Sequence, residues 1–139
     1  MLLGECGLRS INIGSDSETV THTSPGYPAN YRNDLVCEWI VYATGTRRVL
    51  LQINEFHMED RYDFLIVGNG IQSTLSLTLI ARLTGITKIR TLTSTGSEMW
   101  LQIATDRTGT EIGFSVNLTQ VSYVEGNEFK SYCMMFSGS

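Results

Sequence analysis

The sequence predicts an all-β fold, an antiparallel β-sandwich of jelly-roll-like type, and two observations carry the prediction. Apolar residues alternate with polar ones at period two in almost every apolar segment, which is typical of half-buried strands. The composition is rich in Thr, Ser and Gly, and only 17% of the residues are charged, which favours strands over helices. Short strands separated by turn residues indicate a sandwich.

The expected strands follow one another from the first tryptophan to about residue 121. The alternation places them at 38–43, 49–54, 64–68, 99–104 and 114–119. The Leu-rich stretch 73–84 fits a helix or a strand, and its threonines favour a strand. Pro25 and Pro28 are the only prolines, and they predict a stiff, non-helical entry into the strand that carries Cys37.

The length of 139 residues fits one domain. The alternation is lost beyond about Tyr123, so residues 1–122 are expected to form the β-sandwich domain and residues 123–139 a tail or linker. The net charge of −4 argues against nucleic acid as a partner. No apolar run reaches the roughly 18 residues that a membrane-spanning helix needs, so we expect no membrane insertion.

The three cysteines, Cys6, Cys37 and Cys133, lack the spacing of a zinc or redox motif. One disulfide plus one odd thiol is the simplest count. A Cys6–Cys37 bridge is favoured because both residues flank the structured start of the chain. The alternative is a cytosolic protein in which all three are reduced and buried.

Three acidic residues are expected in loops beside strands: Glu59, Asp63 and Asp106. Carboxylates on neighbouring loops at one end of a sandwich can converge on a hard cation such as calcium, which takes six to eight oxygen ligands. The alternative is that all three are solvated loop acids. A glycosidase-like carboxylate pair is a further alternative, but nothing in the sequence indicates an extended substrate cleft, so no enzymatic activity is expected.

An ordered set of short motifs over residues 6 to about 121 resembles the CUB domain, an extracellular β-sandwich module. The matching motifs are Cys6-Gly7, Ser24-Pro25-Gly26-Tyr27-Pro28 with Tyr31, Cys37-Glu38-Trp39, Phe56-His57-Met58-Glu59, Tyr62-Asp63-Phe64-Leu65, and Asp106 with Gly113-Phe114.

The resemblance implies a calcium site and a way of binding partners. Glu59, Asp63 and Asp106 match the calcium ligands of calcium-binding members, and Tyr31 matches a residue that braces the Glu. The exposed edges of the carboxylates would accept a Lys or Arg from a protein partner, and Thr108 would contact the same basic side chain. The implied function is a non-enzymatic, extracellular protein–protein interaction module stabilised by calcium.

The chain departs from the family in lacking its usual second disulfide. One of the missing cysteines would lie near Asp60, and the other would occupy the position of Thr84. Two other functions stay open. The chain could be a calcium-independent structural or adhesion sandwich, or a calcium-dependent carbohydrate-binding domain that uses exposed aromatic residues beside the acids, for which Tyr27, Tyr31 and Tyr62 are candidates.

Asn117-Leu118-Thr119 is an acceptor sequence for N-glycosylation. If Phe114, Val116 and Leu118 face the core, Asn117 faces solvent, as a glycan requires. A secreted protein is therefore expected to be glycosylated at Asn117.

Overall fold

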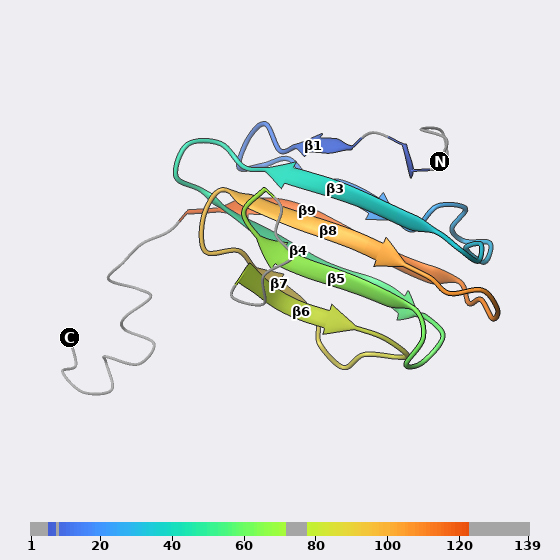
Figure 1. Cartoon of the computed structure of the whole chain (residues 1–139). Helices are drawn as coiled ribbons and strands as arrows, with labels where there is room; N and C mark the ends of the chain where they lie inside the picture. The colour runs from blue at the N-terminus through green and yellow to red at the C-terminus, as the bar shows by residue number, and fades with distance from the viewer. Residues whose placement is uncertain (1–5, 8, 72–77, 123–139) are drawn as a thin grey trace.

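The structure, a computed structural model, describes residues 6–7, 9–71 and 78–122 as two β-sheets packed face to face (Figure 1). Their strands, in chain order, are β1 (Ser10–Asn12), β2 (Val20–Thr23), β3 (Val36–Tyr42), β4 (Arg48–His57), β5 (Phe64–Asn69), β6 (Leu79–Leu83), β7 (Thr91–Thr93), β8 (Glu98–Ala104) and β9 (Gly113–Val121). The predicted all-β sandwich is confirmed. The expected tail, and part of the expected strand at 73–84, lie outside the described residues.

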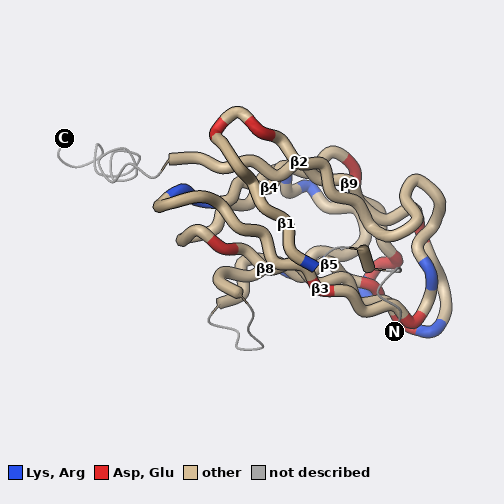
Figure 2. Tube along the Cα trace, turned by 90° about the horizontal axis from the view of Figure 1, so that it is seen from above, with Lys and Arg blue, Asp and Glu red and all other residues tan. Residues whose placement is uncertain are grey.

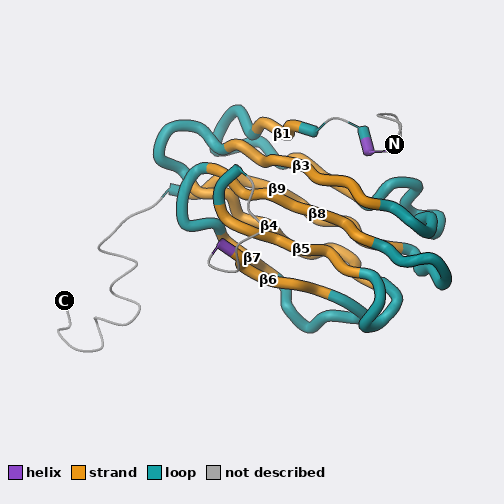
Figure 3. The backbone as a smooth tube through the Cα atoms, viewed as in Figure 1, coloured by secondary structure: helices purple, strands orange, loops and turns teal. Residues whose placement is uncertain are grey.

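One sheet has five strands in the order β1-β3-β8-β5-β6, and the other has four in the order β2-β9-β4-β7. All pairs are antiparallel except β1 with β3. Most connections therefore lie at the two ends of the sandwich (Figure 3). The connections after β4 and β8 lie at the same end, because both strands run towards it.

The core lies between the sheets and takes alternate residues from each long strand. Trp39 and Val41 of β3 are fully buried, as are Phe114, Val116 and Leu118 of β9. Burying a side chain of this size stabilises the fold by about 1.5–3 kcal/mol. The inward direction predicted for the apolar residues of β9 is confirmed.

A β-bulge explains why β4 extends three residues beyond the predicted strand. Its register with β9 shifts between Ile53 and Glu55, and an extra residue exchanges the two faces of a strand. Leu51 and Ile53 point into the core before the bulge, whereas Phe56 and Met58 do so after it. The shift ends the simple alternation at Asn54 but carries the strand on towards Glu59.

Trp100 lies outside the core between the sheets. It is 7% exposed, but it covers Gly68 of the neighbouring strand β5 on the outer face of the five-stranded sheet. A Cβ atom at Gly68 would lie 2.2 Å from the indole, so the glycine makes room for the ring.

Candidate functional site

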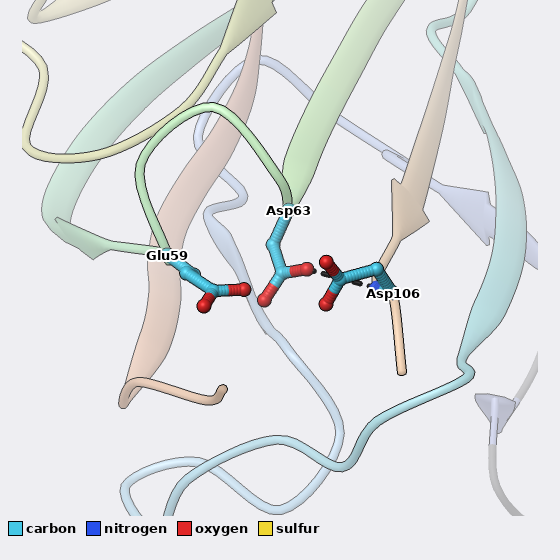
Figure 4. Close-up of side chains that lie close together, drawn as sticks. All are labelled: Glu59, Asp63 and Asp106. Atoms are coloured by element: carbon cyan, nitrogen blue, oxygen red, sulfur yellow. Dashed lines mark hydrogen bonds between the residues drawn. The ribbon is translucent and has the colours of Figure 1, made fainter. Parts of the chain in front are cut away.

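Three carboxylates from three connections meet at one end of the sandwich. Glu59 follows β4, Asp63 directly precedes β5, and Asp106 follows β8. Because Phe64 of β5 pairs with Ala104 of β8, the residues beyond these two strand ends are neighbours. One carboxylate oxygen from each of the three acids lies within 4.8 Å of the others. Figure 4 shows the three side chains pointing towards one another.

Tyr31 links two of these acids from below. Its hydroxyl donates a hydrogen bond of 2.6 Å to Oδ2 of Asp63 and accepts one of 2.9 Å from the backbone N–H of Glu59. Tyr31 is only 2% exposed, so it braces the site from inside. It therefore cannot serve as the exposed aromatic platform considered for a carbohydrate ligand.

Asp63 is the most firmly held of the three acids. Its side chain is fully buried, and its second oxygen, Oδ1, accepts the backbone N–H of Asp106 at 2.9 Å (Figure 4). Thr108 follows the last acid, and its backbone N–H lies 3.3 Å from Oδ1 of Asp106. Thr108 itself is exposed at the surface of the loop.

Burial and mutual repulsion disfavour the charged forms of two of these acids. Burial raises the pKa of Glu59, and the charges of Asp106 and Asp63 raise it further. Burial likewise raises the pKa of Asp63, although the hydrogen bonds from Tyr31 and from the backbone of Asp106 oppose the shift. Figure 2 shows acidic segments at this end of the sandwich, with basic segments among them. A cation among the carboxylates would relieve this repulsion.

The residues present fit a hard divalent cation. Oε1 of Glu59 is buried without a hydrogen-bond partner, and a buried polar atom in that state is costly unless a ligand satisfies it. The connection from Asp106 passes closely over the same carboxylate, because a Cβ atom at Gly109 would lie 2.0 Å from Oε2 of Glu59. An all-oxygen donor set is what calcium prefers.

Two residues of this end were not singled out from the sequence. Gly109 has a φ of +90° and leaves room for Glu59. The charge of Glu111 contributes to raising the pKa of Glu59, and its backbone carbonyl accepts the N–H of Tyr31 at 3.1 Å. Both residues lie in the connection between Asp106 and Gly113.

The predicted disulfide is confirmed between Cys6 and Cys37, whose sulfur atoms are 2.08 Å apart. The indole Nε1 of Trp39 donates to the carbonyl of Cys6 at 2.9 Å, so the bridge is packed against the core. Cys133 lies outside the described residues.

The remaining predicted residue, Asn117, lies in β9 on the outer face of the four-stranded sheet. A hollow of about 760 Å³ near β1 and β2 is lined by residues such as Ile11, Glu18 and His22. The three acids are not part of it. None of the described helices is long and apolar enough to cross a membrane.

Known proteins resemble this chain in sequence and in structure. Human neuropilin-2 is 33% identical over 99 residues, which make up 68% of this chain and 10% of neuropilin-2. The full extracellular region of zebrafish Gpr126/Adgrg6 superposes with a TM-score of 0.71 at 24% identity, over 86% of this chain and 15% of that one. The chain thus spans about a tenth of the length of the curated relatives it matches.

The MASP-1 CUB2 domain bound to Ca²⁺ superposes with a TM-score of 0.64 at 19% identity, over 78% of this chain and 96% of that domain. The sequence profile of the CUB domain matches residues 6–118, which include all three carboxylates and the disulfide. This chain therefore belongs to the CUB domain family.

Proposed function

We propose that this chain is an extracellular protein-interaction module that binds calcium through Glu59, Asp63 and Asp106 and docks a basic side chain of its partner there. One observation carries the proposal. Three carboxylates from separate connections converge within 4.8 Å, and one of them keeps a buried oxygen without a hydrogen-bond partner. A bound cation would offset the repulsion among these carboxylates and supply a partner for the buried oxygen.

Each residue then has a distinct part in binding. Calcium, when bound, supplies the positive charge that neutralises the cluster and joins the three connections. Tyr31 and the backbone N–H of Asp106 orient Asp63. Glu59 and Asp106 are half-buried, so their outer edges can accept charge-assisted hydrogen bonds from a Lys or Arg. The exposed hydroxyl of Thr108 can add a further bond to the same side chain.

Calorimetric titration with calcium tests the metal site, and an immobilised polylysine surface tests the docking. We expect wild type to bind calcium and to bind polylysine more tightly in calcium than in chelator, because the metal organises the acceptors. Attraction of polylysine to a merely acidic surface would change in the opposite sense, because calcium would neutralise the acids. Polylysine binding that weakens on adding calcium would contradict the docking proposal. Absence of calcium binding would leave a calcium-independent structural or adhesion module.

We also propose that Asn117 carries an N-linked glycan. Its side-chain Oδ1 accepts hydrogen bonds from Thr21 and Asn54, at 2.8 and 3.0 Å, which leaves Nδ2 directed away from them for the sugar. Expression in secreting eukaryotic cells should give a protein whose mass falls on treatment with an N-glycosidase. Thr119→Ala should abolish this fall and Thr119→Ser should retain it. A wild-type protein of unmodified mass would contradict the assignment.

A further inference from the structure

The turn that carries two of the three carboxylates is held in a conformation that few residues adopt. Between Glu59 and Asp63 the chain reverses, and the N–H groups of Tyr62 and Asp63 both lie within 3.2 Å of the carbonyl of Glu59. At its centre, Arg61 has a φ of +73°, in the left-handed region that disfavours residues other than glycine. Such a conformation persists where its surroundings hold it in place.

A side chain from a different connection enters this turn. Thr84 directly follows β6, more than 20 residues further along the chain. Its Oγ1 accepts the backbone N–H of Arg61 at 2.9 Å, and it lies 2.7 Å from the carbonyl of Asp63 and 3.1 Å from that of Glu59. A hydroxyl has one proton to donate and two lone pairs. The shortest of these contacts therefore indicates donation to Asp63.

We propose that the Thr84 hydroxyl is a positioning group for the calcium site, because it ties the centre of the Glu59–Asp63 turn to the end that carries Asp63. The inference deepens the proposed function and rests on it. The single disulfide among the described residues joins Cys6 and Cys37, in another part of the domain. Among the described residues, no disulfide ties this turn to another connection. The hydrogen bonds of the Thr84 hydroxyl provide that tie instead.

The turn also has a second attachment that does not depend on the hydroxyl. The backbone N–H of Met58 donates to the carbonyl of Gly85 at 3.0 Å, and the carboxylate of Asp60 lies so close over Gly85 that a Cβ atom there would be 2.6 Å from it. Thr84→Val keeps the shape of the side chain and both of these contacts. We therefore expect the variant to fold, with only the spacing of Glu59 and Asp63 loosened.

The test compares calcium binding by wild type, Thr84→Val and Thr84→Ser in calorimetric titrations. We expect Thr84→Val to bind calcium about tenfold more weakly, the effect of losing one to two net hydrogen bonds, and Thr84→Ser to bind like wild type. Thr44→Val is the matched control, because it removes a hydroxyl bonded to Gln120 in the connection between β3 and β4, at the other end of the sandwich. It should leave calcium affinity unchanged.

Amide hydrogen exchange in chelator supplies a readout that does not involve the metal. The N–H of Arg61 should exchange faster in Thr84→Val than in wild type, whereas the N–H of Met58 should not change. Calcium binding by Thr84→Val equal to that of wild type, or an unchanged exchange rate at Arg61, would overturn the inference alone. Failure of wild type to bind calcium would overturn the proposed function and the inference together.

Discussion

Acidic residues at the two ends of the sandwich have pKa values shifted in opposite directions. At the end that joins β3 to β4, both oxygens of Asp16 accept hydrogen bonds from Arg47, at 2.8 and 3.1 Å, and Gln120 donates a further bond of 2.8 Å. These bonds lower the pKa of Asp16. At the other end, burial and like charges raise the pKa of Glu59 and of Asp63.

The two ends differ in whether the chain itself supplies a counter-charge to these acids. Asp16 receives a counter-charge from the chain itself, in Arg47. For Asp63, the described residues offer a hydroxyl and a backbone donor, and for both Glu59 and Asp63 they place other carboxylates nearby. A raised carboxyl pKa is the direction expected of an acid without a counter-charge, and a lowered one is that of an acid which the fold already pairs.

The largest expected effect comes from truncating Asp63. In Asp63→Ala, the Tyr31 hydroxyl and the N–H of Asp106 lose their acceptor in a buried place, which should lower the free energy of unfolding by about 3 kcal/mol. Asp63→Asn keeps an acceptor and should lose less stability. Both variants should lose most of their calcium affinity. Urea unfolding in chelator measures the stabilities, and equal losses for the two variants would contradict the account of the hydrogen bonds.

A partly buried histidine extends the comparison to pH. His22 packs edge-on against Trp39 with ring centroids 4.3 Å apart, its Nε2 lacks a partner, and burial lowers its pKa from 6.5 to about 4. Between these values the unfolded state binds more protons than the folded state, so stability falls as the pH falls.

We expect a loss of about 2 kcal/mol between pH 7 and pH 5, measured by urea unfolding at each pH. His22→Gln should lose most of this slope, and His57→Gln, the other histidine of the chain, should retain it. A slope that survives in His22→Gln would contradict the prediction.

Filling the space beside the Glu59 carboxylate should have a smaller effect on stability. Gly109→Ala introduces a Cβ atom at a φ of +90° and against the Glu59 carboxylate, which should lower the free energy of unfolding by about 1 kcal/mol and weaken calcium binding. Gly45→Ala is the matched control, because Gly45 also has a positive φ, of +56°, and its Cβ atom would meet nothing within 4 Å. A calcium affinity unaffected by Gly109→Ala would show that the close approach does not matter.

The smallest effect is expected at the end of the sandwich that carries Asp16 and Arg47. The side chain of Asp16 is 56% exposed and that of Arg47 is 36% exposed, and ion pairs open to solvent contribute little to stability. Asp16→Asn should therefore lower the melting temperature by about 2 °C or less and leave calcium affinity unchanged. A large loss of stability would show that the hydrogen bonds among Asp16, Arg47 and Gln120 contribute substantially to the free energy of unfolding.

The sequence predicted what depends on alternation and on motif order. The strands around Trp39 and Phe114 alternate cleanly, and both were predicted within two residues of their bounds. The three acids were named because each was expected in a loop beside a strand and because each matches a calcium ligand of the CUB family. Strands β1, β2 and β7 are only three or four residues long, too short for any periodicity to appear.

The remaining features depend on contacts between distant parts of the chain. The bulge after Ile53 breaks the alternation, so the continuation of β4 to His57 could not be read from the pattern. The roles of Gly109 and Thr84 appear only when separate connections meet. The position of Trp100 over Gly68 likewise depends on how two strands pair, which the sequence of neither strand predicts.

The measurement that tests the central claim most directly is the melting temperature in calcium and in chelator, for wild type, Asp106→Asn and Asp16→Asn. We predict that calcium raises the melting temperature of wild type and of Asp16→Asn by the same amount, and that of Asp106→Asn little or not at all. In chelator, Asp106→Asn should melt no lower than wild type, because it removes one of the repelling charges. If wild type melts at the same temperature in calcium and in chelator, the proposal that Glu59, Asp63 and Asp106 bind calcium is contradicted.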